Sequence, residues 1–358
     1  MHEKDVYERI KDDFPILIMN GTKTYPDPNF FYFSGAKFGG FENCALIVNK
    51  KGITIITMEL EAEAAKQTDC EVFVYKSEAE RQKIITDKLK DLDKVYINAS
   101  KLNTQHYFEI KKMLPSTTLV DCSLEILSTR MIKTKEEVAN LKEATRISSR
   151  ALEAAWSKVH EGMSEKEFGS NLVSSMMELG SALPQCEPTV AFGENTAFPH
   201  FQATERKLRK GDLILADFNS LYNKYTSDLT RTVVFGKSSI VQNEMHDVVL
   251  EANEASRKAI RDGVISRDID HIARNIIDSS KYKGKFIHGL GHGIGLELHD
   301  HPALSINSNL VLKNNMTITV EPGVYVFGVG GLRIEDDILV TKDGAITLTD
   351  TTRDLLEL

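Results

Sequence analysis

Four acidic residues lie inside apolar, strand-like segments, and they constrain the fold of this chain more than any other feature. Asp217 lies in LILADF, and Asp228 lies in YTSDLTRTVV. A hairpin that pairs these two residues would turn midway between them, near Tyr222 and Asn223, where asparagine suits a turn. The two carboxylates would then lie opposite one another on neighbouring strands.

The same pattern recurs near the C-terminus. Glu321 lies in TITVEPG and Glu335 in LRIEDD, and the turn between them is expected near Gly328, in the glycine-rich sequence FGVGG. Like charges that face each other on a sheet are destabilising, and an unpaired buried carboxylate is costly or takes up a proton. One such acid could pair with a base such as Arg231 or Arg333. Two hairpins with the same arrangement favour a metal site.

Four of the ten histidines fall in one short glycine-rich segment, HGLGHGIGLELHDHP. They are His288, His292, His299 and His301. Glycine lets the backbone approach other groups closely, and imidazole is both a common metal ligand and a common general acid or base. The glycine spacing does not fit a dinucleotide-binding fingerprint. The cluster therefore predicts a functional site.

The amino-acid composition excludes several classes of function. The 358 residues include 44 Lys plus Arg and 52 Asp plus Glu, for a formal charge of -8, so we expect no nucleic-acid partner. No apolar stretch approaches the length of a membrane span, and the charged N-terminus lacks the apolar core of a signal peptide. We therefore expect no membrane partner and a cytoplasmic location. The scattered cysteines are expected to be free, mostly buried thiols: Cys44, Cys70, Cys122 and Cys186.

Two kinds of pattern divide the chain. From Phe14 to about Cys122, short β-rich runs alternate with charged helical segments, which predicts an α/β domain. The expected β-rich runs are PILIMN, FFYFSG, CALIV, ITIITM, EVFVY, KVYINAS and TTLVDC. We expect one domain over residues 1–125 and a second over residues 126–358.

Long helices and further strands are predicted for the second domain. Thr134 with Glu137, and Ser164 with Glu167, fit the capping boxes that begin helices. A third helix is expected from about Val241 to Ile260. Strands are indicated by DLILADF, YTSDLTRTVVF, MTITVEPGVYVF and LRIEDDILV. This part therefore mixes long helices with antiparallel strands, an α+β arrangement.

Several segments resemble, in order, the signature blocks of the pita-bread metallopeptidases, family M24, which includes methionine aminopeptidase, Xaa-Pro aminopeptidase and prolidase. These segments are GDLILADFNSLYNKYTSDLTRTVV, HGLGHGIGLELHDHP, TVEPGVY and GLRIEDD. The C-terminal resemblance runs from about residue 134 to the end. The N-terminal part, with NFFYFSG followed by CALIV, resembles the smaller creatinase-type domain of the proline-specific members. The implied fold class is α+β, a pita-bread domain preceded by a creatinase-type α/β domain.

Carried over position by position, the resemblance implies a centre of two divalent metal ions. Its ligands would be Asp217, Asp228, His292, Glu321 and Glu335. Asp217 would chelate one ion, Asp228 and Glu335 would bridge both, and His292 and Glu321 would hold the other. Carboxylates and imidazole suit manganese, cobalt, iron or zinc, and the resemblance favours manganese or cobalt.

The resemblance also implies roles for residues around the metals. Glu321 would relay the proton of the water that attacks the substrate, while His200 and His299 would contact the substrate and stabilise the tetrahedral intermediate. Positions that bind or face the substrate are implied for His288, Tyr325 and Arg333. Structural roles are assigned to His246, His271 and His301.

The implied activity is hydrolysis of the peptide bond between an N-terminal residue and a following proline, in small peptides, by a homodimer. One departure keeps the Xaa-Pro dipeptidase and Xaa-Pro aminopeptidase alternatives open. Many prolidases have an arginine that receives the substrate carboxylate where HDHP is followed here by Ala303. A metal-free creatinase-like hydrolase and a non-catalytic peptide-binding module are disfavoured because all five ligand positions are present. Methionine aminopeptidase activity is disfavoured by the additional N-terminal domain.

Overall fold

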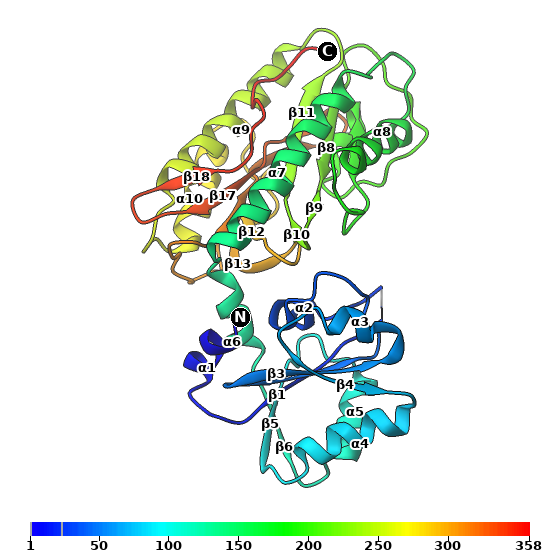
Figure 1. The fold of residues 1–358 in the computed structure, drawn as a ribbon. Coiled ribbons are helices and arrows are strands. Elements are labelled where there is room, and N and C mark those ends of the chain that lie inside the picture. The colour runs from blue at the N-terminus through cyan, green and yellow to red at the C-terminus, as the bar shows by residue number, and fades with distance from the viewer. Residues whose placement is uncertain (1, 23) are drawn as a thin grey trace. The chain divides into compact units, whose positions relative to one another are not determined.

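The computed structural model describes residues 2–22 and 24–358. The chain forms two compact units, Met1–Arg130 and Met131–Leu358, coloured blue to cyan and green to red in Figure 1. Among the described residues, no helix has the length and apolar character needed to cross a bilayer. The four cysteines are free thiols, of which Cys44 and Cys122 are buried and Cys186 is exposed.

A six-stranded mixed sheet forms the centre of the N-terminal unit, in the order β4-β3-β2-β1-β5-β6. Strands β1, β2 and β3 pair antiparallel, while β3–β4, β1–β5 and β5–β6 pair parallel. The strands are β1 (Ile16–Met19), β2 (Ala45–Asn49), β3 (Gly52–Met58), β4 (Glu71–Tyr75), β5 (Lys94–Ile97) and β6 (Thr118–Asp121). The helices are α1 (Glu3–Ile10), α2 (Pro28–Ser34), α3 (Ala62–Ala65), α4 (Glu78–Leu89), α5 (Thr104–Met113) and α6 (Ser123–Met131), with the 3-10 turn η1 (Glu59–Glu61). The mixed helices and strands expected for this part are confirmed.

One expected strand is a helix. The run FFYFSG lies in α2, which begins after Asp27, whose side chain accepts a hydrogen bond from the backbone N–H of Asn29. Pro28 occupies the start of the helix, and Gly35 ends it in a left-handed conformation with φ 66°. A short aromatic run fits a buried strand and a buried helix equally well. The capping residues on either side decide in favour of the helix.

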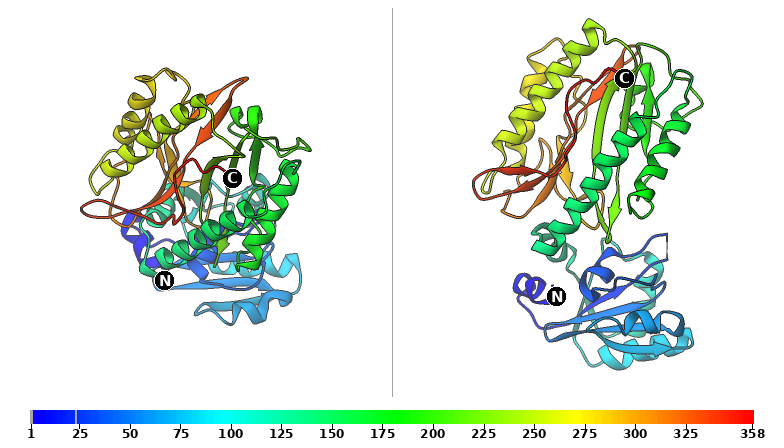
Figure 2. Two further views of the ribbon diagram at one scale, coloured as in Figure 1. Left: turned by 90° about the horizontal axis from the view of Figure 1, so that it is seen from above. Right: turned by 45° about the horizontal axis from the view of Figure 1, so that its top comes forward.

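The C-terminal unit contains two sheets, each covered by a pair of helices (Figures 1 and 2). One sheet has the order β11-β8-β7 and shares a core with α7 and α8, while the other has the order β13-β12-β14-β17-β18 and packs with α9 and α10. The helices are α7 (Lys135–Trp156), α8 (Glu165–Glu178), α9 (Ile240–Ala259) and α10 (Ser266–Asp278), with the 3-10 turn η2 (Gly193–Ala197).

Two short hairpins, β9–β10 and β15–β16, extend from these sheets. The first sheet and its hairpin comprise β7 (Thr189–Phe192), β8 (Leu213–Phe218), β9 (Leu221–Tyr222), β10 (Tyr225–Thr226) and β11 (Leu229–Val234). The second sheet and its hairpin comprise β12 (Gly291–Gly293), β13 (Asp300–Leu304), β14 (Thr317–Val320), β15 (Gly323–Val326), β16 (Gly330–Arg333), β17 (Asp336–Val340) and β18 (Ala345–Thr347).

The helices expected from capping signals are confirmed. The reciprocal capping box of Thr134 and Glu137 begins α7, and the Ser164 side chain accepts a hydrogen bond from the backbone N–H of Glu167 at the start of α8. Helix α9 begins and ends within one residue of the expected range. Helix α10 is not among the predicted helices, and its N-cap residue Ile265 makes no side-chain cap. The chain thus lacks the usual starting signal for α10.

The first acidic hairpin is present, but its expected register is wrong by two residues. The turn lies at Asn223 and Lys224, which have φ of 47° and 70°, one residue beyond the expected position. Because each one-residue movement of a turn shifts the paired residue by two, Asp217 lies opposite Thr230 and not opposite Asp228. Side chains two residues apart on a strand point to the same face. Asp228 is therefore a diagonal neighbour of Asp217.

The second acidic hairpin has the expected register. Strands β15 and β16 pair Gly323 with Arg333, and β14 and β17 pair Val320 with Asp336. Both pairings follow one continuous register, which places Glu321 opposite Glu335. The turn contains Gly328 with φ 77°, in the left-handed region that favours glycine.

Candidate metal centre

Acidic residues from both hairpins converge with one histidine of the glycine-rich segment. Ligand-type atoms of Asp228, His292 and Glu335 all lie within 4.8 Å of one another. Glu321 joins them, with its Oε1 3.6 Å from His292 Nε2. Asp217 is linked to the group through an ion pair with Arg333. All five expected metal ligands therefore lie in one region of the C-terminal unit.

At the two opposed glutamates, the backbone N–H groups no longer bond to the other strand of the hairpin. The backbone N–H of Glu321 donates to Leu290 O at 2.8 Å, and that of Glu335 donates to Thr230 O at 3.1 Å. Pro322, which has no N–H to contribute, follows Glu321. Each glutamate is thus bound to a different neighbouring segment, and this brings the histidine segment and β11 to the same point.

His292 is oriented so that one ring nitrogen faces the acids. Its Nδ1 lies 3.0 Å from Gly293 O and donates to it, which leaves Nε2 at 3.5 Å from Asp228 Oδ2. A hydrogen bond of this kind fixes the tautomer and aims the other nitrogen at a metal. The flanking glycines are required for this position: a Cβ on Gly291 would lie 2.2 Å from Thr319 O, and one on Gly293 would lie 2.0 Å from His301 O.

Within residues 2–22 and 24–358, one buried carboxylate oxygen of Glu335 lacks a hydrogen-bond partner. Its Oε2 accepts a hydrogen bond from Thr230 Oγ1 at 2.6 Å. Its Oε1 has no hydrogen-bond partner among the residues that the structure describes. Burial, together with the charges of Asp228 and Glu321, raises the pKa of Glu335 well above its usual value. A buried oxygen without a donor is costly, and a cation at this point would remove that cost.

The electrostatics of the neighbouring groups indicate the same need for positive charge. Burial raises the pKa of Asp228 to about 6 and that of Glu321 to about 7. Burial also disfavours the charged form of His292, but the carboxylates of Asp228 and Glu321 outweigh it and raise the pKa of His292 to about 9. Protons thus offset the repulsion between the acids. Carboxylate oxygens and an imidazole nitrogen are the donors that divalent cations use, so these residues fit a divalent metal site.

Arg333 is a buried guanidinium among these acids, only 2% exposed. It pairs with Asp217, and its Nη1 and Nε donate to Tyr325 Oη at 2.6 Å and to Thr230 Oγ1 at 3.1 Å. Since Thr230 donates in turn to Glu335, Arg333 connects Asp217 to the opposite side of the cluster. It thereby fixes the direction of two carboxylates.

A second chain of hydrogen bonds runs from Arg333 to His288. Tyr325 Oη lies 2.9 Å from His288 Nε2, and His288 Nδ1 lies 2.8 Å from Gly289 O, to which it donates. Burial, helped by the charge of Arg333, lowers the pKa of His288 to about 4, so the ring is neutral near pH 7. Tyr325 therefore accepts from Arg333 and donates to the free nitrogen of His288.

His299 and His200 lie at the margin of the cluster. The centroid of the His299 ring is 4.4 Å from that of His292, and burial with the charge of His292 lowers the pKa of His299. The exposed His200 influences the pKa of both His288 and His299, which places it near them. The structure thus brings all of the expected site residues together, while the roles assigned to them stay predictions.

Two residues of the site were not expected from the sequence. Thr230 links Arg333 to Glu335. Asp337 Oδ2 accepts hydrogen bonds from the backbone N–H of Asp228 at 3.0 Å and from Thr145 Oγ1 at 3.1 Å. The alternation of strand side chains contains the signal, because Thr230 lies two residues after Asp228 and Asp337 two residues after Glu335.

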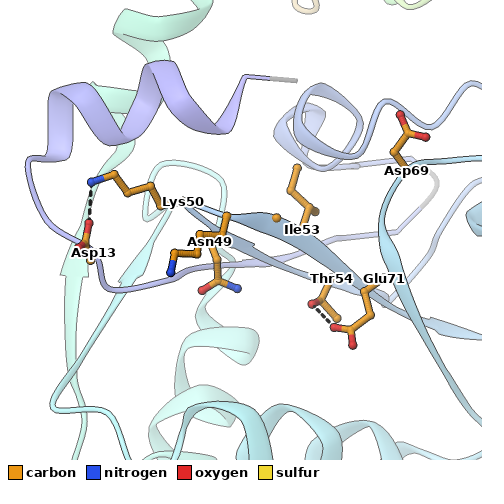
Figure 3. A pocket seen from close by; sticks show the side chains of 9 residues that line it. Asp13, Asn49, Lys50, Ile53, Thr54, Asp69 and Glu71 are labelled. Atoms are coloured by element: carbon orange, nitrogen blue, oxygen red, sulfur yellow. Dashed lines mark hydrogen bonds and ion pairs between the residues drawn. The ribbon is translucent and has the colours of Figure 1, made fainter.

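A separate hollow of about 720 Å³ lies on the N-terminal unit, around the turn between β2 and β3 (Figure 3). Figure 3 shows two pairs of side chains there, Lys50 with Asp13 at 2.9 Å and Thr54 with Glu71 at 2.8 Å. None of the expected site residues lines this hollow. It therefore adds nothing to the cluster.

Comparisons with known proteins agree with this geometry. The model of the family described as "Metallopeptidase family M24" matches residues 139–342, and the model described as "Creatinase/Prolidase N-terminal domain" matches residues 16–132. The Xaa-Pro dipeptidase of Pyrococcus furiosus is 36% identical over 341 residues, 92% of each chain. The prolidase structure from Pyrococcus horikoshii has a TM-score of 0.91 at 32% identity and covers 99% of each chain. The X-Pro aminopeptidase structure from Thermotoga maritima has a TM-score of 0.91 at 31% identity and covers 99% of this chain and 100% of that one.

Proposed function

The chain belongs to metallopeptidase family M24, and from that premise we propose that it is an Xaa-Pro peptidase that uses two divalent metal ions. It would hydrolyse the bond between an N-terminal residue and a following proline. Family membership confirms the expected fold, a pita-bread domain preceded by a creatinase-type domain, and the expected metallopeptidase class. The proline specificity is supported by the names of the relatives, Xaa-Pro dipeptidase, prolidase and X-Pro aminopeptidase.

The convergence of the Asp228, Glu321 and Glu335 carboxylates on His292 carries the proposal, and Asp217 is linked to them through Arg333. Glu335 Oε1, which has no hydrogen-bond partner among the described residues, and the raised pKa values of Asp228 and Glu321 support a bound cation there. The proposed ligands are Asp217, Asp228, His292, Glu321 and Glu335. Manganese or cobalt is proposed as the metal, and zinc and iron also accept this set of donors.

When bound, a pair of divalent ions would lower the pKa of water and polarise the carbonyl of the bond that is cut. Glu321 is proposed to take the proton from the attacking water. Its side chain is 18% exposed, whereas Glu335 is 2% exposed, so Glu321 is the glutamate that water can reach. A carboxylate that accepts this proton can return it to the leaving nitrogen.

The histidines near the acids would contact the substrate. His200 and His299 are proposed to donate hydrogen bonds to the oxygen on which charge develops. His288 is proposed to face the proline ring, because it is neutral and held in place by Tyr325. Arg333 would keep Tyr325 and Asp217 in position.

The length of the preferred peptide depends on what receives the substrate carboxylate. Ala303 lies in β13 directly opposite His292, and its side chain carries no charge. A dipeptidase would need another cationic residue for that task, whereas an aminopeptidase acting on longer peptides would not. The proposal therefore includes both activities. The expected homodimer and cytoplasmic location stay predictions.

Hydrolysis of matched peptides tests the proposal. Protein reconstituted with manganese would be given Ala-Pro, Ala-Pro-Ala and the control Ala-Ala-Ala, each with and without a chelator. We expect cleavage of at least one proline peptide that the chelator abolishes, with Ala-Ala-Ala left intact. Cleavage of Ala-Pro alone would identify a dipeptidase, and cleavage of Ala-Pro-Ala an aminopeptidase. A metal-loaded protein that cleaves neither would contradict the proposal, and activity indifferent to the chelator would favour a metal-free hydrolase.

A further inference from the structure

We propose that Glu165 is a positioning residue whose carboxylate sets the location of His200. It would do so by fixing both ends of the His200 segment, defined as residues 193–204. The inference rests on the proposed function, because it assumes that His200 contacts the substrate. Glu165 itself is the first residue of α8 and belongs to none of the motifs that suggested a catalytic site.

The carboxylate of Glu165 is completely buried and makes four hydrogen bonds. Its Oε1 accepts from the backbone N–H of Phe192 and from Asn195 Nδ2, both at 2.9 Å. Its Oε2 accepts from the backbone N–H of Thr204 at 2.9 Å and from Thr204 Oγ1 at 2.5 Å. Phe192 and Asn195 precede His200, whereas Thr204 follows it. One carboxylate therefore joins the two ends of the segment.

The first part of the segment is also fixed to the hairpin that carries Tyr325 and Arg333. Thr196 Oγ1 donates to Gly193 O at 2.6 Å and accepts from the backbone N–H of Gly331 at 2.7 Å. A Cβ on Gly331 would lie 2.3 Å from Thr196 O, so the two backbones are in close contact. The start of the segment is thus held at a fixed position relative to the candidate site.

The part that contains His200 has no comparable network of hydrogen bonds to the described residues. Residues 199–203 make no hydrogen bond with any residue that the structure describes. Ala203 packs against the core of α7, α8 and their sheet, and the Phe201 ring contacts that of Phe198. The polar support of this stretch therefore comes from the flanking residues. On the far side, that anchor is Thr204, whose backbone N–H and hydroxyl donate to Glu165 and whose carbonyl accepts from the backbone N–H of Lys166 at 3.2 Å.

Stabilisation of the start of α8 does not explain why the Glu165 carboxylate is buried, because burying a charged group costs free energy. Acids at helix N-termini are usually exposed and contribute a few tenths of a kcal/mol to about 1 kcal/mol through the helix dipole. Here the neighbouring base Arg206 makes its ion pair with Asp212, at 2.8 Å. The charge of Glu165 is offset by the donors of the segment, each of which forms a charge-assisted hydrogen bond. All of its hydrogen bonds to side chains serve the His200 segment.

Isosteric substitutions can separate this role from general stability. Glu165→Gln keeps the size of the side chain but turns an NH₂ group toward donors, so part of the four-bond arrangement is lost. We expect kcat for a proline peptide to fall roughly 10- to 100-fold, the scale that misplacement of a substrate-contacting group by about 1 Å produces. Metal content would be unchanged. Thr204→Val, which removes one donor, would lower kcat in the same direction, whereas Thr204→Ser, which keeps it, would restore activity.

A double-mutant cycle with His200→Ala decides whether Glu165 acts through His200. If it does, the double variant is no slower than His200→Ala alone. Multiplication of the two single losses would overturn the inference, because it would show that Glu165 acts by another route.

Hydrogen exchange of the free protein gives a readout that does not depend on activity. Faster exchange in residues 193–204 of the Glu165→Gln protein, with unchanged exchange around Asp217, is the expected result. Unchanged exchange in residues 193–204 would overturn the inference even in an active enzyme. If the wild-type protein cleaved no proline peptide while the exchange result held, the proposed function would fail but the anchoring by Glu165 would stand.

Discussion

Replacement of Asp336 by asparagine is expected to destabilise the C-terminal unit strongly, although Asp336 is not a proposed metal ligand. Its fully buried carboxylate accepts hydrogen bonds from Arg231 Nη2 at 2.7 Å and from Arg353 Nε and Nη2 at 2.7 and 3.0 Å. Asn253 Nδ2 donates to it as well, at 3.2 Å. Burial disfavours the carboxylate, but Arg231 and Arg353 outweigh it and hold the pKa of Asp336 below its usual value.

The size of the loss in unfolding free energy depends on the arginines that lose their anionic partner. The Arg231 side chain is 2% exposed, so Asp336→Asn strands a guanidinium away from water, and breaking a buried pair costs about 3 to 5 kcal/mol. The Arg353 side chain is 23% exposed and can turn toward solvent, which favours the lower end, about 3 kcal/mol. For a unit of this size, a loss of that amount lowers Tm by roughly 6 to 12 °C.

Denaturant unfolding and calorimetry of the chelator-treated proteins would measure this loss. Lys237→Gln is the matched control, because it breaks the pair with Glu357 in which the Lys237 side chain is 92% exposed. Exposed pairs of this kind contribute about 0 to 1 kcal/mol. An Asp336→Asn protein within 1 kcal/mol of wild type would refute the reasoning, since it would show that the buried arginines need no anion.

Three further substitutions test individual residues of the site. Asp228→Asn should abolish turnover and lower the bound metal together, as measured by peptide assay and elemental analysis, and retained turnover would contradict its assignment as a ligand. His299→Ala should slow turnover while the metal stays bound, and loss of metal would instead make His299 a ligand. Burial and the charge of Arg333 lower the pKa of His288 from 6.5 to about 4. Between these two pH values the unfolded chain binds a proton at His288 and the folded chain does not. The stability from the neutral ring is therefore present above pH 6.5 and is lost as pH falls toward 4. From pH 7 to pH 5, wild type should lose about 2 kcal/mol more unfolding free energy than His288→Gln in chelator, and equal losses would contradict a buried neutral ring.

Much of the fold follows from local sequence signals. The residues that begin α7 and α8 and the glycine-rich turn of β15–β16 are confirmed. The failures occur where local signals are ambiguous or missing: the aromatic run of α2 fits either structure, and α10 begins without a side-chain cap. In the first acidic hairpin, an error of one residue in the turn became an error of two residues in the pairing of Asp217.

The candidate site likewise contains residues that the sequence predicted and residues that it did not. The acids were identifiable because a charged residue inside an apolar strand is conspicuous, and the histidines because they cluster among glycines. The residues that hold the acids and histidines in place were not predicted, because their partners are distant in the sequence. Asp337 bonds Thr145 across 192 positions, and Glu165 bonds Thr204 across 39. Strand alternation indicates that Asp337 shares a face with Glu335, but the partner that each of these residues bonds depends on the tertiary fold.

The most direct test of the metal-dependent activity is a titration of metal-free protein with manganese, in which cleavage of Ala-Pro and Ala-Pro-Ala is measured against the number of ions bound per chain. We predict that the metal-free protein is inactive, and that cleavage of at least one of the peptides rises with bound metal and reaches its limit at two ions per chain. Full cleavage by the metal-free protein, or a protein that binds two ions and cleaves neither peptide, would contradict this prediction.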